Sequence, residues 1–296
     1  MAQSDQGDSL KGFLLALVAY LIWGALPLYI HMVNHVPLAE VLAHRILWSL
    51  PIALAVLVVM GRTEDLKRAI RTPSMLAMAA LTATLVSINW GVYLYAIQSG
   101  RVIEAALGYF INPLFSILLG AIFLREKLSP GQWGAVALAA AAVGVLTWEA
   151  GSLPWLSLAL TLSWGFYALA KRALPIGPNQ GFTLEVMILA PIALAYLGWL
   201  WAGGRMVFGY SGARDVWLLL GCGAVTAVPL MIYANGAKLL RLSTIGLMQY
   251  IAPSFVFLIA VLVFGEPFGG AKLVAFPMIW GALVIYSADM LRRRLR

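Results

Sequence analysis

The sequence predicts an all-α, polytopic membrane protein of ten transmembrane helices in two inverted five-helix repeats, with the N- and C-termini both cytoplasmic. Three observations predict this class: an extreme apolar composition, a regular alternation of basic residues, and a repeat of about 140 residues. Of the 296 residues, 62% are hydrophobic and only 11% are charged. This composition excludes the ordinary soluble classes and makes the lipid bilayer the expected solvent.

Clusters of turn-forming and charged residues cut the chain into ten apolar stretches, each near the roughly 20 residues that a helix needs to cross the bilayer. We expect spans at 12–33, 38–60, 74–98, 102–125, 130–148, 154–172, 180–202, 214–237, 243–264 and 269–290. The residues before them, 1–11, are polar rather than basic and lack a cleavage site of small residues. We interpret them as a cytoplasmic leader before a retained helix.

Basic residues orient the chain, because Lys and Arg are enriched in cytoplasmic loops. Fifteen of the twenty fall on the side of the two termini, including the basic cytoplasmic tail at 291–296. The other five are Arg45, Arg101, Arg205, Arg214 and Lys272. This alternation explains the net charge of +8 without nucleic acid as a partner. We expect a multi-pass protein of a bacterial inner membrane.

An internal repeat divides the chain into halves. A shift of 140 residues places the segment PIALA at Pro51 on the same segment at Pro191. The same shift aligns Tyr93 with Tyr233, Leu107 with Leu247, Ile111 with Ile251, Pro113 with Pro253, Phe115 with Phe255 and Glu126 with Glu266, and one residue more aligns Trp23-Gly24 with Trp164-Gly165. We therefore expect repeats at 12–148 and 154–290.

Each predicted half holds five helices, an odd number, so the second half enters the membrane from the opposite side. Inverted repeats are characteristic of transporters, in which the halves exchange conformations to give alternating access. A duplication kept only for packing is the alternative interpretation.

Polar and aromatic residues near mid-membrane are the candidates for solute binding, because apolar side chains facing lipid need no special explanation. The candidates are Trp23, Asn89, Trp90, Tyr93, Tyr109, Asn112, Trp164, Tyr167, Tyr233 and Gln249. An unpaired amide in hydrocarbon is costly, so Asn89 must meet a neighbouring helix, a water or a solute. For the tryptophans the alternative is an interfacial aromatic belt, and for Asn89 it is a bond that only joins helices.

Three prolines within predicted spans, Pro113, Pro229 and Pro253, are candidate hinges. A proline removes a helical hydrogen bond and bends the helix. Matched kinks at Pro113 and Pro253 would suit a pair of gates, although prolines also occur in transmembrane helices for packing alone.

No carboxylate falls at the centre of a predicted span, so we expect no proton relay built on a buried carboxylate. Glu185 comes nearest, and we expect it to pair with Lys171 or Arg172. Basic residues are absent from the centres too, and we place Arg45 at the headgroups or at the mouth of the cavity. The predicted cavity is therefore neutral, aromatic and lined by amides, which suits neutral amino acids better than strongly anionic solutes.

All three histidines, His31, His35 and His44, lie with Glu40 within fourteen residues around the first outer loop. They resemble a metal site, but Pro37 interrupts any continuous helix and no third ligand is shown to converge. We expect neither a metal nor another cofactor.

Four segments carry a family resemblance: His44–Ser49 (HRILWS), Asn89–Ala96 (NWGVYLYA), Gly108–Leu114 (GYFINPL) and Phe123–Leu128 (FLREKL). They closely resemble the RarD-like branch of the drug/metabolite transporter superfamily, over essentially the whole chain. The resemblance implies two inverted EamA repeats around a central cavity, formed by the first, third, fourth, sixth, eighth and ninth helices. It also implies export of amino acids, metabolites or drugs.

The leading hypothesis is an exporter of neutral, often aromatic amino acids, and the second is efflux of amphiphilic drugs of the chloramphenicol type. A membrane enzyme acting on lipid-linked substrates is a remote third, because the sequence has no nucleophile elbow, Walker loop or zinc-protease motif. Small residues on the fifth span, Gly134, Ala137, Ala141 and Gly144, are compatible with a monomer or a weak dimer.

Overall fold

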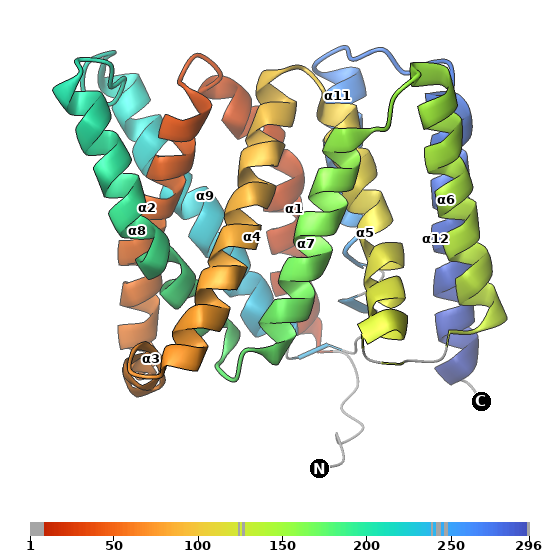
Figure 1. Cartoon of the computed structure of the whole chain (residues 1–296), viewed down its shortest axis with the longest axis horizontal. Coiled ribbons are helices and arrows are strands. Elements are labelled where there is room, and N and C mark those ends of the chain that lie inside the picture. The colour runs from red at the N-terminus through yellow and green to blue at the C-terminus, as the bar shows by residue number, and fades with distance from the viewer. Residues whose placement is uncertain are drawn as a thin grey trace.

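The computed structural model describes residues 9–294 apart from 124, 126–127, 238, 241–243 and 246–247. The sequence predictions that involve Glu126, Lys238 or Leu247 lie outside the described residues. Figure 1 shows the long helices standing side by side, and the described helices are α1 (Leu10–Met32), α2 (Leu38–Val59), α3 (Thr63–Ile70), α4 (Pro73–Gln98), α5 (Val102–Phe123), α6 (Pro130–Ala150), α7 (Trp155–Ala173), α8 (Pro178–Ala202), α9 (Ala213–Ala237), α11 (Ile251–Leu262) and α12 (Lys272–Arg294).

Eight of the described helices are long and apolar enough to cross a membrane: α1, α2, α4, α5, α6, α8, α9 and α12. The chain is therefore an all-helical, polytopic membrane protein. Of the other two predicted spans, α7 carries Lys171 and Arg172 in its last turn, which lowers its mean hydropathy. The described part of α11 has only 12 residues, and three residues of the predicted ninth span lie outside the described chain. A count of ten spans stays a prediction.

The short helix α3 is not among the predicted elements. Its acidic residues lie in the first turn and its basic ones in the last, as the helix dipole favours. Leu66 and Ala69 are buried, and α3 contacts α4 and α8. On its exposed side Lys67 donates to Glu64 at 2.7 Å, and this hydrogen bond lowers the pKa of Glu64. Figure 1 places α3 at the same edge of the helix layer as the start of α1 and the end of α12.

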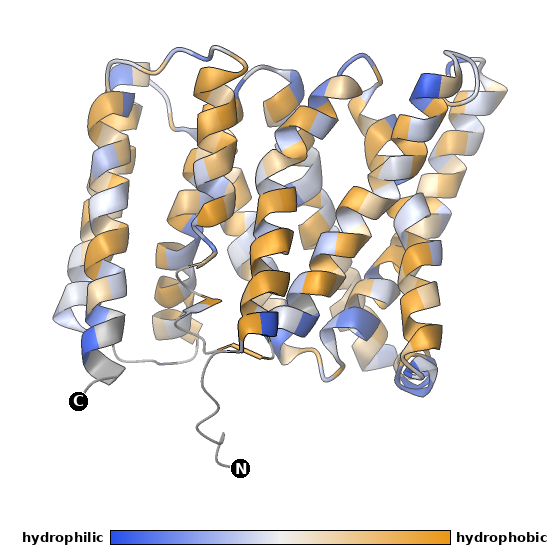
Figure 2. Cartoon of the chain, turned by 180° about the vertical axis from the view of Figure 1, so that it is seen from behind, coloured by the Kyte–Doolittle hydropathy of each residue, from blue (hydrophilic) through white to orange (hydrophobic). Residues whose placement is uncertain are grey.

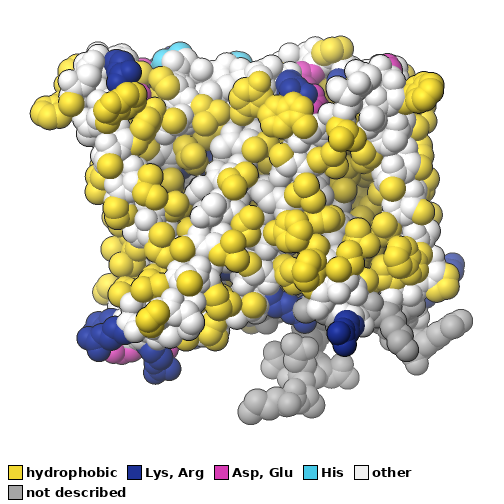
Figure 3. Space-filling model, viewed as in Figure 1, with side chains coloured by type: hydrophobic (Ala, Val, Ile, Leu, Met, Phe, Trp, Pro, Cys, Tyr) yellow, Lys and Arg dark blue, Asp and Glu magenta, His cyan; other side chains and the backbone are white. Residues whose placement is uncertain are grey.

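The outer surface is apolar between two polar edges. Trp148, Val59 and Trp217 are 91%, 87% and 72% exposed, which only a lipid environment makes favourable over so much surface. Hydrophobic residues run along the length of the helices in Figure 2. In Figure 3 the Lys and Arg side chains of the visible face lie toward its edges and the hydrophobic ones between them.

The two halves of the chain interleave rather than form separate bundles. In the first half α1 packs on α9 and α11, and in the second half α7 packs on α4 and α5. Two glycines permit these close approaches. A Cβ on Gly24 would lie 2.6 Å from Phe255, and a Cβ on Gly165 would lie 2.4 Å from Phe115.

The candidate hinges differ in their local structure. Pro113 lies inside α5 and Pro229 inside α9, as predicted. Pro253 is the third residue of α11 rather than a mid-helix residue, so the prediction of matched kinks is wrong in position. A proline in the first turn costs no helical hydrogen bond, because the N–H groups there have no partner within the helix.

Candidate functional site

Asn89 on α4 is the centre of a buried polar network between three helices. Its side chain is 1% exposed. Its Nδ2 donates to the Leu160 carbonyl at 3.1 Å and to Ser163 Oγ at 3.0 Å, both on α7. Its Oδ1 accepts a hydrogen bond from the Tyr109 hydroxyl of α5 at 3.3 Å. Every polar atom of the amide therefore has a protein partner, as the helix-joining alternative for Asn89 requires.

Close packing of α5 on α7 sets this geometry. A Cβ on Gly108 would lie 2.8 Å from the Ser157 carbonyl, so only glycine allows the two backbones to meet here. Thr161 then donates to the Gly108 carbonyl at 2.9 Å, and Ser157 donates to the Glu104 carbonyl at 2.7 Å. These bonds fix Tyr109, one residue after Gly108, against Asn89.

Arg45 joins this network, contrary to the prediction that it lies at the headgroups or at the cavity mouth. Its side chain is buried, with the residue only 3% exposed. The guanidinium lies 5.0 Å from the ring centroid of Trp90, and its Nε donates to Thr226 Oγ1 of α9 at 3.1 Å. Tyr93 and Tyr109 lie close enough to interact with it electrostatically. The prediction of an interior without basic residues is therefore wrong.

We call these residues the Asn89 cluster: Arg45, Asn89, Trp90, Tyr93, Tyr109 and Thr226. The Tyr93 and Tyr109 rings pack with their centroids 5.6 Å apart. One turn beyond Tyr109, Asn112 is 7% exposed, and its Oδ1 has no hydrogen-bond partner among the described residues. The structure thus brings together four predicted site residues from α4 and α5, with Asn112 beside them.

Trp164 and Tyr167 of α7 form a second group, in the same hydrophobic cluster as Trp90. Their ring centroids lie 5.5 Å apart. The Tyr167 hydroxyl donates to Glu185 of α8 at 3.2 Å, and Lys171 pairs with the other oxygen of that carboxylate at 2.5 Å. The predicted pairing of Glu185 with Lys171 is confirmed.

Trp23 and Tyr233 form a third group with Tyr20, between α1 and α9. The three rings pack edge to face or tilted, with centroids 5.4 to 5.6 Å apart. Met248 and Ile251 belong to the same hydrophobic cluster, and Gln249 lies between them in the chain. The predicted site residues therefore fall into separate groups rather than one.

Glu40 and His44 lie buried near the start of α2. Glu40 Oε1 accepts from the backbone N–H groups of Val207 and Phe208, each at 2.9 Å, which anchors the loop between α8 and α9. His44 Nε2 lies 4.0 Å from the same oxygen, and Glu40 Oε2 and His44 Nε2 have no hydrogen-bond partner among the described residues. Buried carboxylates are thus present, although outside the span centres.

The other two histidines point to different partners. His35 pairs with Asp215 at 3.0 Å, and the His31 ring packs 4.8 Å from that of Phe264. Within the described chain, no three His, Cys, Asp or Glu side chains gather as a possible metal site.

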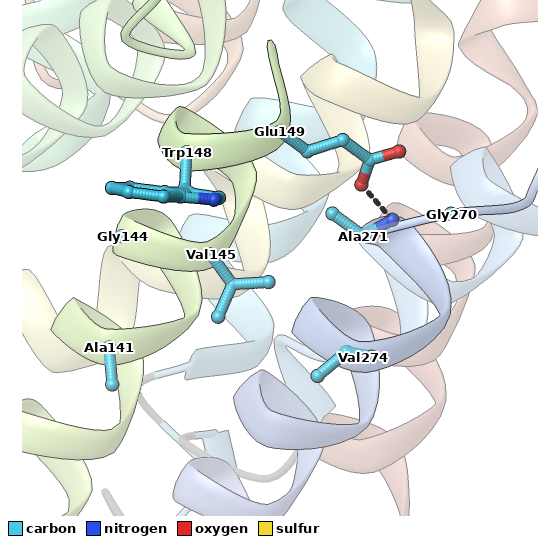
Figure 4. Close-up of a pocket in the computed structure, with 8 residues that line it drawn as sticks. All are labelled: Ala141, Gly144, Val145, Trp148, Glu149, Gly270, Ala271 and Val274. Carbon is cyan, nitrogen blue, oxygen red and sulfur yellow. Dashed lines mark hydrogen bonds between the residues drawn. The ribbon is translucent and has the colours of Figure 1, made fainter. Parts of the chain in front are cut away.

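A recess of about 510 Å³ lies between α6 and α12, away from these groups. Figure 4 shows Trp148, Val145 and Val274 around it and the Glu149 carboxylate hydrogen-bonded to the Ala271 N–H. Its side chains are mostly apolar and Trp148 faces the membrane, so we do not place the functional site there.

Comparison with known proteins agrees with the resemblance in the four sequence segments. Residues 10–148 match the EamA-like transporter family. A Vibrio cholerae protein called an uncharacterized transporter is 41% identical over 97% of this chain and 95% of its own. Protein RarD of Escherichia coli is 39% identical over 99% of both chains, and a Pseudomonas aeruginosa protein called chloramphenicol-sensitive protein RarD is 33% identical over 97% of both.

A solved crystal structure matches 96% of this chain and 98% of its own with a TM-score of 0.61. Its sequence is only 19% identical, so it supports the fold alone. The near-complete coverage of the sequence relatives supports more: this chain is a multi-pass transporter of the bacterial inner membrane and belongs to the RarD-like branch of the drug/metabolite transporter superfamily.

Proposed function

We propose that the protein exports small organic solutes, foremost neutral and aromatic amino acids, by alternating access through a pathway at the Asn89 cluster. The observation that carries the proposal is the open amide oxygen of Asn112, buried beside the aromatic rings of Tyr93 and Tyr109. A buried acceptor without a partner is costly, and the ammonium group of an amino acid would satisfy it. Aromatic rings nearby suit an apolar side chain.

The ten-helix inverted repeat, with both termini cytoplasmic, is part of the proposal. The reciprocal contacts support it: Gly24 of one half meets Phe255, and Gly165, which aligns with Gly24, meets Phe115, which aligns with Phe255. The family match over residues 10–148 supports a first repeat at 12–148. Exchange of the two halves' conformations would then open the pathway to alternate sides, with bending at Pro113 and Pro229.

Efflux of amphiphilic drugs is the second candidate, favoured by the name of the Pseudomonas aeruginosa relative. Uptake of labelled phenylalanine and leucine into proteoliposomes, with chloramphenicol as competitor, separates the two. Saturable amino-acid uptake that chloramphenicol does not inhibit supports amino-acid export. Labelled chloramphenicol uptake without amino-acid uptake supports the drug instead.

A further inference from the structure

The guanidinium of Arg45 has no counter-ion in the part of the chain that the structure describes. None of the salt bridges found there includes Arg45. Its Nη1 atom is buried and makes no hydrogen bond with a described residue. Burying a charge is strongly unfavourable unless an opposite charge and hydrogen bonds replace the lost water. An unpaired buried arginine in a membrane protein therefore indicates a functional site.

The same molecule offers a direct comparison. The shift of 140 residues that aligns Pro51 with Pro191 aligns Arg45 with Glu185. Glu185 is equally buried, at 1% exposure, but Lys171 and Tyr167 satisfy both of its oxygens. The buried charge of α8 thus has its counter-charge within the protein, and the aligned charge of α2 does not.

The surroundings of Arg45 hold it in place and leave one edge free. The Trp90 ring covers one face of the guanidinium and Thr226 takes its Nε, so that Nη1 remains the unpartnered donor. Backbone packing fixes this position, because Ser49, four residues on, donates to the Arg45 carbonyl at 2.6 Å and to the Gly223 carbonyl of α9 at 3.3 Å. A planar guanidinium with a free edge matches a carboxylate better than any other small anionic group of similar charge.

We propose that Arg45 binds the carboxylate of the transported solute. The proposal deepens the proposed function, on which it rests for the identity of the solute, since an amino acid would place its carboxylate on Arg45 and its ammonium on the Asn112 oxygen. It also narrows the substrate class. Solutes that carry a carboxylate and an apolar group bind, whereas amines and neutral alcohols of the same shape do not.

The test uses the purified full-length protein and four ligands that share one ring: phenylacetate, 2-phenylethanol, 2-phenylethylamine and phenyl phosphate. Binding is measured by isothermal titration calorimetry and by the shift of the thermal unfolding midpoint. We expect phenylacetate to bind the wild type, and the alcohol and the amine to bind roughly tenfold or more weakly, the loss typical of a charge-assisted hydrogen bond. Equal binding of phenylacetate and 2-phenylethanol, or no binding of phenylacetate, overturns the proposal. Phenyl phosphate binding as tightly as phenylacetate overturns the assignment to a carboxylate.

Variants locate the effect. Arg45→Gln is expected to lower phenylacetate affinity roughly tenfold or more. The matched control is Arg205→Gln, because Arg205 also lies over a tryptophan ring, 3.8 Å from that of Trp199, but is exposed. Arg205→Gln should leave phenylacetate affinity unchanged. Where Arg45→Gln does not fold, Arg45→Lys replaces it, with weaker phenylacetate binding expected from the loss of the bidentate geometry. Unchanged affinity in a folded Arg45 variant overturns the proposal.

The outcomes separate this inference from the proposed function. If phenylacetate binds through Arg45 but no labelled amino acid is transported, amino-acid export is wrong and the carboxylate site stands. If phenylalanine is transported and Arg45→Gln leaves its KM unchanged, amino-acid export stands and the carboxylate site is wrong.

Discussion

Gly24 of α1 packs directly against Phe255 of α11, so closely that a Cβ on the glycine would lie 2.6 Å from the Phe255 Cβ. Because both atoms are close to their backbones, neither can move away without shifting a helix. This contact holds an element of the first half against an element of the second.

Gly24→Ala should therefore destabilise the protein by about 1 to 3 kcal/mol, the usual cost of overpacking. Thermal unfolding of purified protein measures the change. The control is Gly134→Ala, because a Cβ at Gly134 meets no atom within 4 Å. Equal midpoints for the two variants would show that α1 and α11 are not in close contact.

Asn89 and Asn112 should respond differently to replacement by leucine. Asn89→Leu leaves the Leu160 carbonyl, Ser163 and Tyr109 without this partner, and we expect a loss of about 1 to 3 kcal/mol in stability. Asn112→Leu removes an oxygen that no described residue binds, so we expect stability to be nearly unchanged and the KM for amino-acid uptake to rise. Unfolding midpoints and uptake kinetics on the same samples separate the two effects. The opposite pattern would assign solute binding to Asn89.

Glu40 should hold the loop between α8 and α9 against α2. Glu40→Ala removes the acceptor of the Val207 and Phe208 N–H groups, and we expect faster hydrogen exchange at both amides together with a stability loss of about 1 to 3 kcal/mol. Glu40→Gln keeps one oxygen acceptor and should lose less. Similar exchange in all three proteins would mean that these bonds do not anchor the loop.

Glu266 gives the protein a predicted pH dependence. The carboxylate accepts from the Val102 N–H at 2.6 Å and the Ile103 N–H at 2.9 Å, at the start of α5. Burial nevertheless raises its pKa above the ordinary value of 4.5. Because the folded-state pKa is the higher one, this group's stabilising contribution is present below about pH 4.5 and is lost as the pH rises through the folded value.

The measurement is the unfolding midpoint of wild type and Glu266→Gln between acidic and neutral pH. An amide does not titrate, so the variant should lack the part of the pH dependence that Glu266 provides. Superposable pH profiles of the two proteins would assign that dependence to other groups.

The helices themselves could be predicted from the sequence, because hydrophobic length alone determines where a chain can cross a bilayer. Predicted spans such as 38–60 and 102–125 end within a few residues of α2 and α5. The helix α3 could not be found in the same way, since it lies outside the apolar stretches and is stabilised by Leu66 and Ala69 packing on neighbours distant in sequence.

The candidate site could be predicted only in part. Asn89, Tyr93 and Tyr109 were identifiable because polar side chains inside apolar spans need partners. The position of Arg45 was not, because a basic residue eight places into a span can reach either outward to the headgroups or inward, and only the packing of α4 and α9 decides. Its alignment with Glu185 was the available signal.

The most direct test of the account is uptake of radiolabelled phenylalanine into proteoliposomes by wild type, Trp164→Ala and Trp23→Ala, with and without an imposed pH gradient. Saturable uptake by the wild type that is lost in folded Trp164→Ala, whose ring adjoins the Trp90 region, is the predicted result. No uptake above that of empty liposomes by folded wild-type protein, for phenylalanine or for any other neutral amino acid, would contradict the central claim.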